Sequence, residues 1–115
     1  MSYEVYLAET FQKCVKILKK KYRRIKDDLK NVIERLEEEP SIGDPIPGWN
    51  KEIWKIGVAS SDVEKGKRGG FRVIYLWKAG EFKVYLLAVY LKGEKEEISK
   101  KEVERLLKKL NQELE

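Results

Sequence analysis

The sequence predicts a single α+β domain over residues 1–115. An N-terminal strand and a helix pair pack on an antiparallel sheet of about four strands, with a helix at the C-terminus. Three observations lead to this fold. Apolar residues recur at helical spacing between residues 10 and 38. β-prone runs follow between residues 52 and 91. A helix-capping signal then precedes one more apolar stripe near the C-terminus.

The N-terminal half is predicted to form one strand and two helices. Residues 3–8 are β-prone, and Thr10 is expected to cap the helix that follows. The apolar face of that helix comprises Phe11, Cys14, Val15 and Leu18. The apolar face of the second helix, residues 24–38, comprises Ile25, Leu29, Val32, Ile33 and Leu36. Pro40 ends this helix, and residues 39–51, which hold all three prolines, are predicted to be a loop.

The C-terminal half is predicted to contribute three strands and the last helix. The strands are expected at residues 52–59, 70–78 and 82–91. Residues 79–81 join the last two strands as a hairpin turn. Ser99 and Glu102 form a capping box at the start of the helix. Its apolar stripe comprises Val103, Leu106, Leu107 and Leu110.

The composition excludes several classes of protein. There is no histidine and only one cysteine, so zinc sites and Ser-His or Cys-His triads lack their usual parts. We expect no metal and no other cofactor, and any catalysis must use Lys, Arg, Tyr or carboxylates. The longest purely apolar stretch, residues 84–91, is far shorter than the roughly 20 residues of a membrane span. With no signal peptide visible, we expect a cytoplasmic protein without membrane contact.

Positive charge is concentrated in the middle of the chain. The net charge is +5, and residues 51–95 alone hold 10 basic and 5 acidic side chains. A localised positive field indicates a polyanionic partner, most simply nucleic acid. A solubility charge with accidental clustering is the alternative.

The segment that contains Lys65, Lys67 and Arg68 has the appearance of a phosphate-binding loop. It fails the Walker pattern, because Arg68 stands where Ser or Thr should coordinate magnesium and Ser61 replaces the leading glycine. What remains is a glycine-rich loop with three cations that can approach an RNA phosphate, or an exposed loop with solvated lysines.

Further cations lie in and after the predicted strands. If the strand faces coincide, one open sheet surface carries Lys55, Arg72, Lys83 and Tyr85, although an ordinary solvated face would look the same. The segment that closes the last strand adds an aromatic side chain able to stack on a base and two more cations. These three residues are Tyr90, Lys92 and Lys95.

At GKRGGFRVIYLW, followed by YLLAVYLKGEKEEIS, the sequence resembles the RelE/ParE superfamily of bacterial and archaeal toxins, and especially its HigB-like members. The resemblance extends over about residues 3–110. It implies the toxin of a type II toxin–antitoxin system, an endoribonuclease that cleaves messenger RNA, usually in the ribosomal A site. It also implies a cognate antitoxin that silences the toxin, with operator DNA contacted only through the toxin–antitoxin complex.

The resemblance also implies particular site residues. Arg72 matches a strand arginine of RelE-like toxins, and Lys55 matches a lysine of the preceding strand. Gly57 stands where a second lysine often occurs, so that role is vacant or is taken by Lys67. The tyrosine that some RelE members use near the last helix is replaced by Ser99. The predicted catalytic residues are Lys55, Lys67, Arg72, Lys92 and Lys95. The predicted RNA-binding residues are Lys65, Arg68, Lys83, Tyr85 and Tyr90, with Tyr90 as the substitute for the missing tyrosine.

Two other functions stay open at this point. A ParE-like poison of DNA gyrase would inhibit by binding protein and would arrest replication rather than translation. A plain nucleic-acid-binding module would bind RNA or DNA without cutting it.

Overall fold

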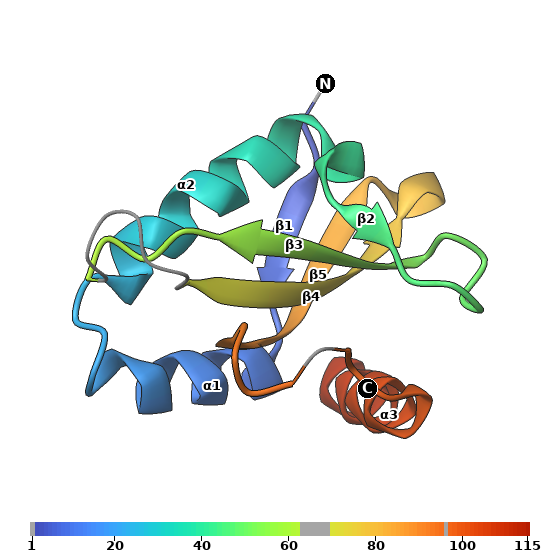
Figure 1. The fold of residues 1–115 in the computed structure, drawn as a ribbon. Coiled ribbons are helices and arrows are strands. Elements are labelled where there is room, and N and C mark those ends of the chain that lie inside the picture. The colour runs from blue at the N-terminus through green and yellow to red at the C-terminus, as the bar shows by residue number, and fades with distance from the viewer. Residues whose placement is uncertain (1, 63–69, 96) are drawn as a thin grey trace.

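The structure is a computed structural model that describes residues 2–62, 70–95 and 97–115. Figure 1 shows how its helices and strands are arranged. In chain order they are β1 (Glu4–Leu7), α1 (Glu9–Lys19), α2 (Ile25–Glu38), β2 (Asp44–Pro45), β3 (Ile53–Val58), β4 (Phe71–Lys78), β5 (Lys83–Leu91) and α3 (Lys100–Leu114). The predicted α+β fold, with a helix pair, a sheet and a C-terminal helix, is confirmed.

The sheet has the strand order β1-β5-β4-β3-β2. All neighbouring pairs are antiparallel except β1 and β5, which run parallel. The short β2 lies inside the segment predicted to be a loop, where Asp44 and Pro45 pair with Lys55 and Trp54 of β3. Two residues bounded by prolines and glycines carry too little pattern to be recognised as a strand from the sequence. The sheet therefore gains a fifth strand beside β3.

The two faces of the sheet pack against different helices. In Figure 1, α2 and α3 lie on opposite sides of the sheet. The α2-facing core of the sheet includes Trp54, Ile56, Val58, Phe71, Val73 and Tyr75. The α3-facing core includes Ile53, Ile74, Leu76, Tyr85, Leu87 and Tyr90. Burial of these alternating apolar residues on both faces is the main stabilising contribution to such a fold.

The predicted N-cap residue is correct for α3 and wrong for α1. Ser99 caps α3 as predicted, because its hydroxyl accepts a hydrogen bond of 3.1 Å from the Glu102 backbone N–H. The prediction that Thr10 caps α1 is wrong, since the helix already begins at Glu9 and its N-cap position is Ala8. The Thr10 hydroxyl instead donates a hydrogen bond of 2.6 Å to the Leu87 carbonyl of β5. The Thr10 side chain therefore makes a tertiary contact with β5 instead of capping its own helix.

Candidate functional site

The sheet register brings two of the three predicted strand cations, Lys55 and Arg72, to one place. Arg72 of β4 pairs with Gly57 of β3 on one side and with Tyr90 of β5 on the other. Lys55 lies two residues from Gly57 on the same strand and therefore on the same, α3-facing side. Side chains directly opposite each other in such pairs have Cβ atoms about 4.5–5.5 Å apart. Arg72 and Tyr90 are such a directly opposite pair, and Lys55, which pairs with Ile74, lies diagonally from Arg72 at about 7–8 Å.

Lys92 joins this group across Gly57. Its backbone N–H donates a hydrogen bond of 3.2 Å to the Gly70 carbonyl, which fixes the chain just beyond β5. A Cβ atom built on Gly57 would lie 3.0 Å from the Lys92 Nζ atom and 3.2 Å from its Cε atom. The Lys92 ammonium group thus occupies the space that a side chain at position 57 would fill, beside the residue that pairs with Arg72.

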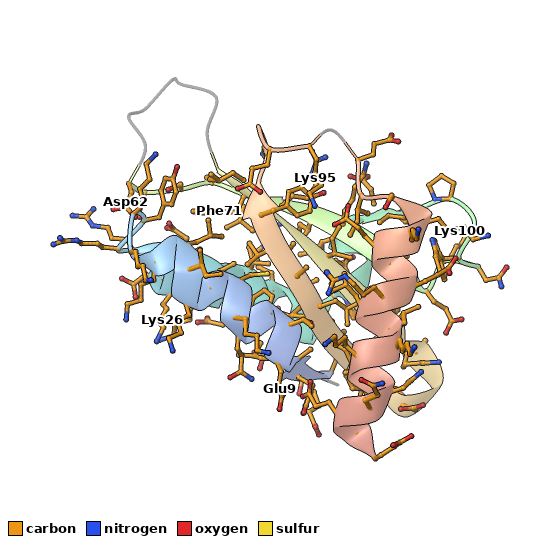
Figure 2. The ribbon with its side chains drawn as sticks, turned by 90° about the horizontal axis from the view of Figure 1, so that it is seen from below. Glu9, Lys26, Asp62, Phe71, Lys95 and Lys100 are labelled. Atoms are coloured by element: carbon orange, nitrogen blue, oxygen red, sulfur yellow. The ribbon has the colours of Figure 1, made fainter. Side chains whose placement is uncertain are left out.

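Lys95 completes the group from the segment between β5 and α3. Its Nζ atom lies 4.8 Å from the centre of the Tyr90 ring and 2.8 Å from the Glu102 carboxylate. Figure 2 shows Lys95 at the same end of the molecule as Lys100, where α3 begins, and Glu9 at the opposite end. We call Lys55, Arg72, Lys92 and Lys95 the cationic cluster.

The charges of the cluster favour the ionised form of both titratable neighbours, Tyr90 and Glu102, but burial outweighs them at Tyr90. Burial raises the pKa of the Tyr90 hydroxyl, while the charges of Arg72 and Lys95 work against that rise. Tyr90 is therefore an uncharged phenol at neutral pH. The hydrogen bond from Lys95 is the largest cause that lowers the pKa of Glu102, so this carboxylate is ionised beside the cluster.

Two hollows adjoin the cluster. A cavity of about 310 Å³ has Lys55 in its lining, together with residues of the β2–β3 loop and of the segment before α3. A larger cleft of about 760 Å³ lies between α1 and α3, and Tyr90, Lys95 and Glu102 are among its lining residues. Cationic side chains next to concave surfaces suit an extended anionic ligand.

The structure does not bring Lys83 and Tyr85 into this cluster. Both face α3 as the alternation predicted, but Lys83 pairs with Lys78 at the other end of β4, about 20 Å from Arg72 by strand geometry. Tyr85 is 6% exposed, packs against Tyr6, and its hydroxyl lies 3.5 Å from the Glu81 carboxylate. The expected open surface over this end of the sheet is therefore not present, because α3 covers it.

The position of Tyr90 does not fit the base-stacking role that the sequence predicted for it. Only 6% of its surface is exposed and Lys95 lies over its ring, so the ring is not available to a nucleobase in this arrangement. Lys65, Lys67 and Arg68 of the glycine-rich loop lie outside the described residues.

Two features of the site were missed by the sequence reading. Glu102 was recognised only as a capping residue, although its carboxylate also holds Lys95. Gly57 looked like a vacancy, although it accommodates the Lys92 ammonium group. Spacing along one strand carries no signal for either contact, because both depend on how separate elements pack.

The described part of the chain shows neither of two other kinds of site. No helix within residues 2–62, 70–95 and 97–115 is long and apolar enough to cross a membrane. The same residues contain no group of three or more Cys, Asp or Glu side chains that could hold a metal ion.

Comparison with known proteins identifies the fold. The whole chain superposes on the whole of a mutant of the Escherichia coli toxin RelE in the free state, with a TM-score of 0.60 and 18% sequence identity. A chain from the toxin–antitoxin complex RelBE2 of Mycobacterium tuberculosis matches with a TM-score of 0.53 and 22% identity, over 78% of this chain and 91% of that one. No protein-family model matches the sequence. The protein thus has a RelE-like fold.

Proposed function

We propose that this protein is the toxin of a toxin–antitoxin pair, a metal-independent endoribonuclease that cleaves messenger RNA on the ribosome in the cytoplasm. The observation that carries the proposal is the cationic cluster on the α3-facing side of a RelE-like sheet. Lys55, Arg72, Lys92 and Lys95 come from three separate segments of the chain, yet they gather within one small area. RNA is the polyanion that such an area suits.

The residue types fit cleavage of RNA by its own 2′-hydroxyl group. This reaction requires a base for the hydroxyl proton, stabilisation of charge on the phosphoryl group and an acid for the departing 5′ oxygen. The Arg72 guanidinium can hold the scissile phosphate with two parallel donors. Lys55 is the proposed base, and Lys92 and Lys95 are the proposed donors to the departing oxygen.

Dependence on the ribosome follows from the weakness of these catalytic groups. The cluster consists of three lysines and one arginine, and the sequence has no histidine. Precise positioning of the RNA must then supply much of the rate enhancement, and such positioning can contribute roughly 7–11 kcal/mol. A ribosome that holds the codon in place provides that positioning.

The proposed partner is an antitoxin with an acidic segment. One protein of similar fold was solved within a toxin–antitoxin complex. The net charge of residues 51–95, which supply the cationic cluster, is +5 and equals that of the whole chain. An acidic segment that covers the cluster or displaces α3 would block RNA, and DNA contact would occur only through the complex. Coexpression with the neighbouring small gene should give a soluble complex and relieve toxicity, whereas harmless overexpression of this chain alone would count against the proposal.

Mapping of messenger RNA ends after brief induction in cells tests the function most directly. We expect new 5′ ends at fixed positions within translated codons, and none after induction of the Arg72→Ala variant. Purified protein should cut free RNA slowly or not at all, while programmed ribosomes should yield one discrete cut. Equal cleavage of free and ribosome-bound RNA would exclude ribosome dependence. Replication arrest with gyrase inhibition and without RNA cleavage would instead identify a gyrase poison.

A further inference from the structure

We propose that the cavity beside Lys55 is a nucleobase-binding pocket in which Trp49 stacks on one base of the bound RNA. This inference rests on the proposed function and deepens it, because it adds a base-recognition site next to the cationic cluster. Trp49 is a residue that the sequence analysis did not single out.

The pocket has the size and the lining of a site for one planar ring. Its volume of about 310 Å³ lies at the small end of the range for ligand sites. Its apolar lining comprises Ile46, Pro47, Trp49 and Ile98. Its polar lining includes Lys55, Glu97 and Lys100. An apolar lining that also includes hydrogen-bond donors and an acceptor suits a nucleobase, which has two flat faces and a polar rim.

The loop that carries Trp49 is held in an uncommon backbone conformation. Gly48, Asn50 and Lys51 all have positive φ values, of 92°, 51° and 59°. The loop is fixed in place because the Glu52 N–H donates to the Trp49 carbonyl at 2.9 Å, and the Trp54 indole N–H donates to the Lys51 carbonyl at 2.7 Å. Left-handed conformations of non-glycine residues cost free energy, and they occur disproportionately at functional sites.

Trp49 differs from the other two tryptophans of the chain. Trp54 and Trp77 contact each other edge to face at 5.4 Å, and Trp54 also stacks on Tyr75 on the α2-facing side. Within the described residues, the half-buried Trp49 has no such ring contact. It packs against the edge of the α3-facing core and lines the cavity with its remaining surface. An aromatic ring that lines a cavity and has no aromatic neighbour in the protein is suited to stack on an aromatic ring of a ligand.

Continuity with the cluster favours RNA over other ligands. Lys55 belongs both to the cationic cluster and to the lining of the pocket. A nucleotide whose phosphate lies at Arg72 and Lys55 can therefore place an adjoining base against Trp49. Lys100, at the first turn of α3, adds a second positive charge at the pocket. The lining holds two cations, Lys55 and Lys100, and one carboxylate, Glu97, so its net positive charge favours a ligand that carries phosphate over a purely apolar side chain.

Fluorine NMR of protein labelled with 5-fluorotryptophan tests this inference in the intact chain. The probe is a single-stranded trinucleotide with 2′-O-methyl riboses, which cannot be cleaved, and the control is an abasic backbone of equal length. We expect the RNA trinucleotide, added up to millimolar concentration, to shift the Trp49 resonance. The Trp54 and Trp77 resonances serve as internal controls and should not move. No shift at Trp49, or an equal shift with the abasic backbone, would overturn the inference.

Substitutions at position 49 separate stacking from packing. Removal of an aromatic stacking partner should weaken trinucleotide binding by about 5- to 150-fold. Trp49→Leu should show this loss, whereas Trp49→Phe should retain most of the affinity for the trinucleotide. The two variants should have similar melting temperatures, which shows that folding does not cause the difference. Equal binding by both variants would contradict a stacking role. A shift confined to a complex with the antitoxin, with none from RNA, would assign the pocket to the protein partner and overturn the inference.

The outcome is distinguishable from that of the proposed function. If the Trp49→Leu variant still cleaves RNA on ribosomes and the Trp49 resonance of the unsubstituted protein does not shift with RNA, the base-binding pocket is excluded and the ribonuclease proposal is retained. If the resonance responds to RNA but no RNA is cut, the pocket stands and the ribonuclease fails.

Discussion

The two ends of the β4–β5 pair carry similar residues in different surroundings. At one end Arg72 lies opposite Tyr90, with Lys92 and Lys95 nearby. At the other end Lys78 lies opposite Lys83, and Tyr85 lies two residues after Lys83 on the same face of β5. The first end adjoins the two hollows described above. At the second end Lys78 and Glu52 line a hollow of about 360 Å³ and pair with each other at 3.3 Å.

The path of α3 accounts for this difference. The C-terminal part of the helix is held at the Tyr85 end, where Glu113 accepts hydrogen bonds from the Tyr6 hydroxyl and from the Glu9 backbone N–H. Its N-terminal end begins beyond the cluster and is linked to it by the Lys95–Glu102 ion pair. Tyr85 and Tyr90 are each only 6% exposed, so both ends bury an aromatic ring, and the ends differ in the contacts that the helix makes there. Position along the strand therefore matters as much as the face.

The largest expected effect comes from Arg72. Arg72→Ala should lower the rate of cleavage on programmed ribosomes by about 100- to 1,000-fold, since it removes the main donor to the phosphoryl charge. Arg72→Lys should restore little, because an ammonium group lacks the planar pair of donors. Lys83→Ala, at the other end of the same strand pair, is the matched control and should cleave normally. Full activity in a folded Arg72→Ala variant would remove this residue from the site.

Gly57→Ala tests the position of the Lys92 ammonium group. The new methyl group would lie 3.0 Å from Nζ, and the flexible lysine would move rather than the backbone. Cleavage should fall, with a coupling to Lys92 of about 0.5–3 kcal/mol in a double-mutant cycle with Lys92→Met. Gly80→Ala meets no atom within 4 Å and is the control. Independent, additive effects of the two substitutions would contradict the assignment.

Glu102→Gln should alter stability in a pH-dependent way. The pKa of Glu102 is lowered by Lys95, so the stabilisation is complete above the unfolded value near 4.5 and is lost as the pH falls through the lower folded value. At neutral pH the variant should lose about 0.2–1 kcal/mol, the usual range for a partly exposed pair. Urea unfolding at pH 7 and pH 3 measures the difference, which should shrink at pH 3. A loss of equal size at both pH values would exclude the ion pair as its cause.

The smallest effect is expected at the covered end of the sheet. Tyr85→Phe removes a hydroxyl whose contact with Glu81, at 3.5 Å, is at the limit of a hydrogen bond. Its free energy of unfolding should change by less than about 0.5 kcal/mol and cleavage should be unchanged. A clear loss of cleavage would show that RNA also reaches this end of the sheet.

Local patterns in the sequence predicted the elements well and their assembly less well. The Ser99 cap, the apolar helix faces and the alternation in β3 and β4 depend on neighbouring residues, and all were recognisable. The failure at Thr10 came from a competing contact with Leu87, far away in the chain. β2 was missed because its only signal is the partner strand.

The same distinction applies to the candidate site. Alternation placed Lys55 and Arg72 on one face, but it placed Lys83 and Tyr85 there as well. Only the register and the path of α3 separate the two pairs. The contacts of Lys92 with Gly57 and of Lys95 with Glu102 join residues from different elements. The periodicity of apolar residues within one segment cannot predict contacts between different segments.

The parallel pairing of β1 with β5 has a consequence for synthesis of the chain. Glu4 at the beginning of the sequence pairs with Lys83, and Leu7 pairs with Leu86. During translation the first strand therefore emerges long before its partner exists, and it must wait through the synthesis of every other strand. Pairings this distant in sequence form late, because closing the intervening chain costs entropy. The sheet edge and the site that depends on β5 are completed together, only after residues 83–91 have been synthesised.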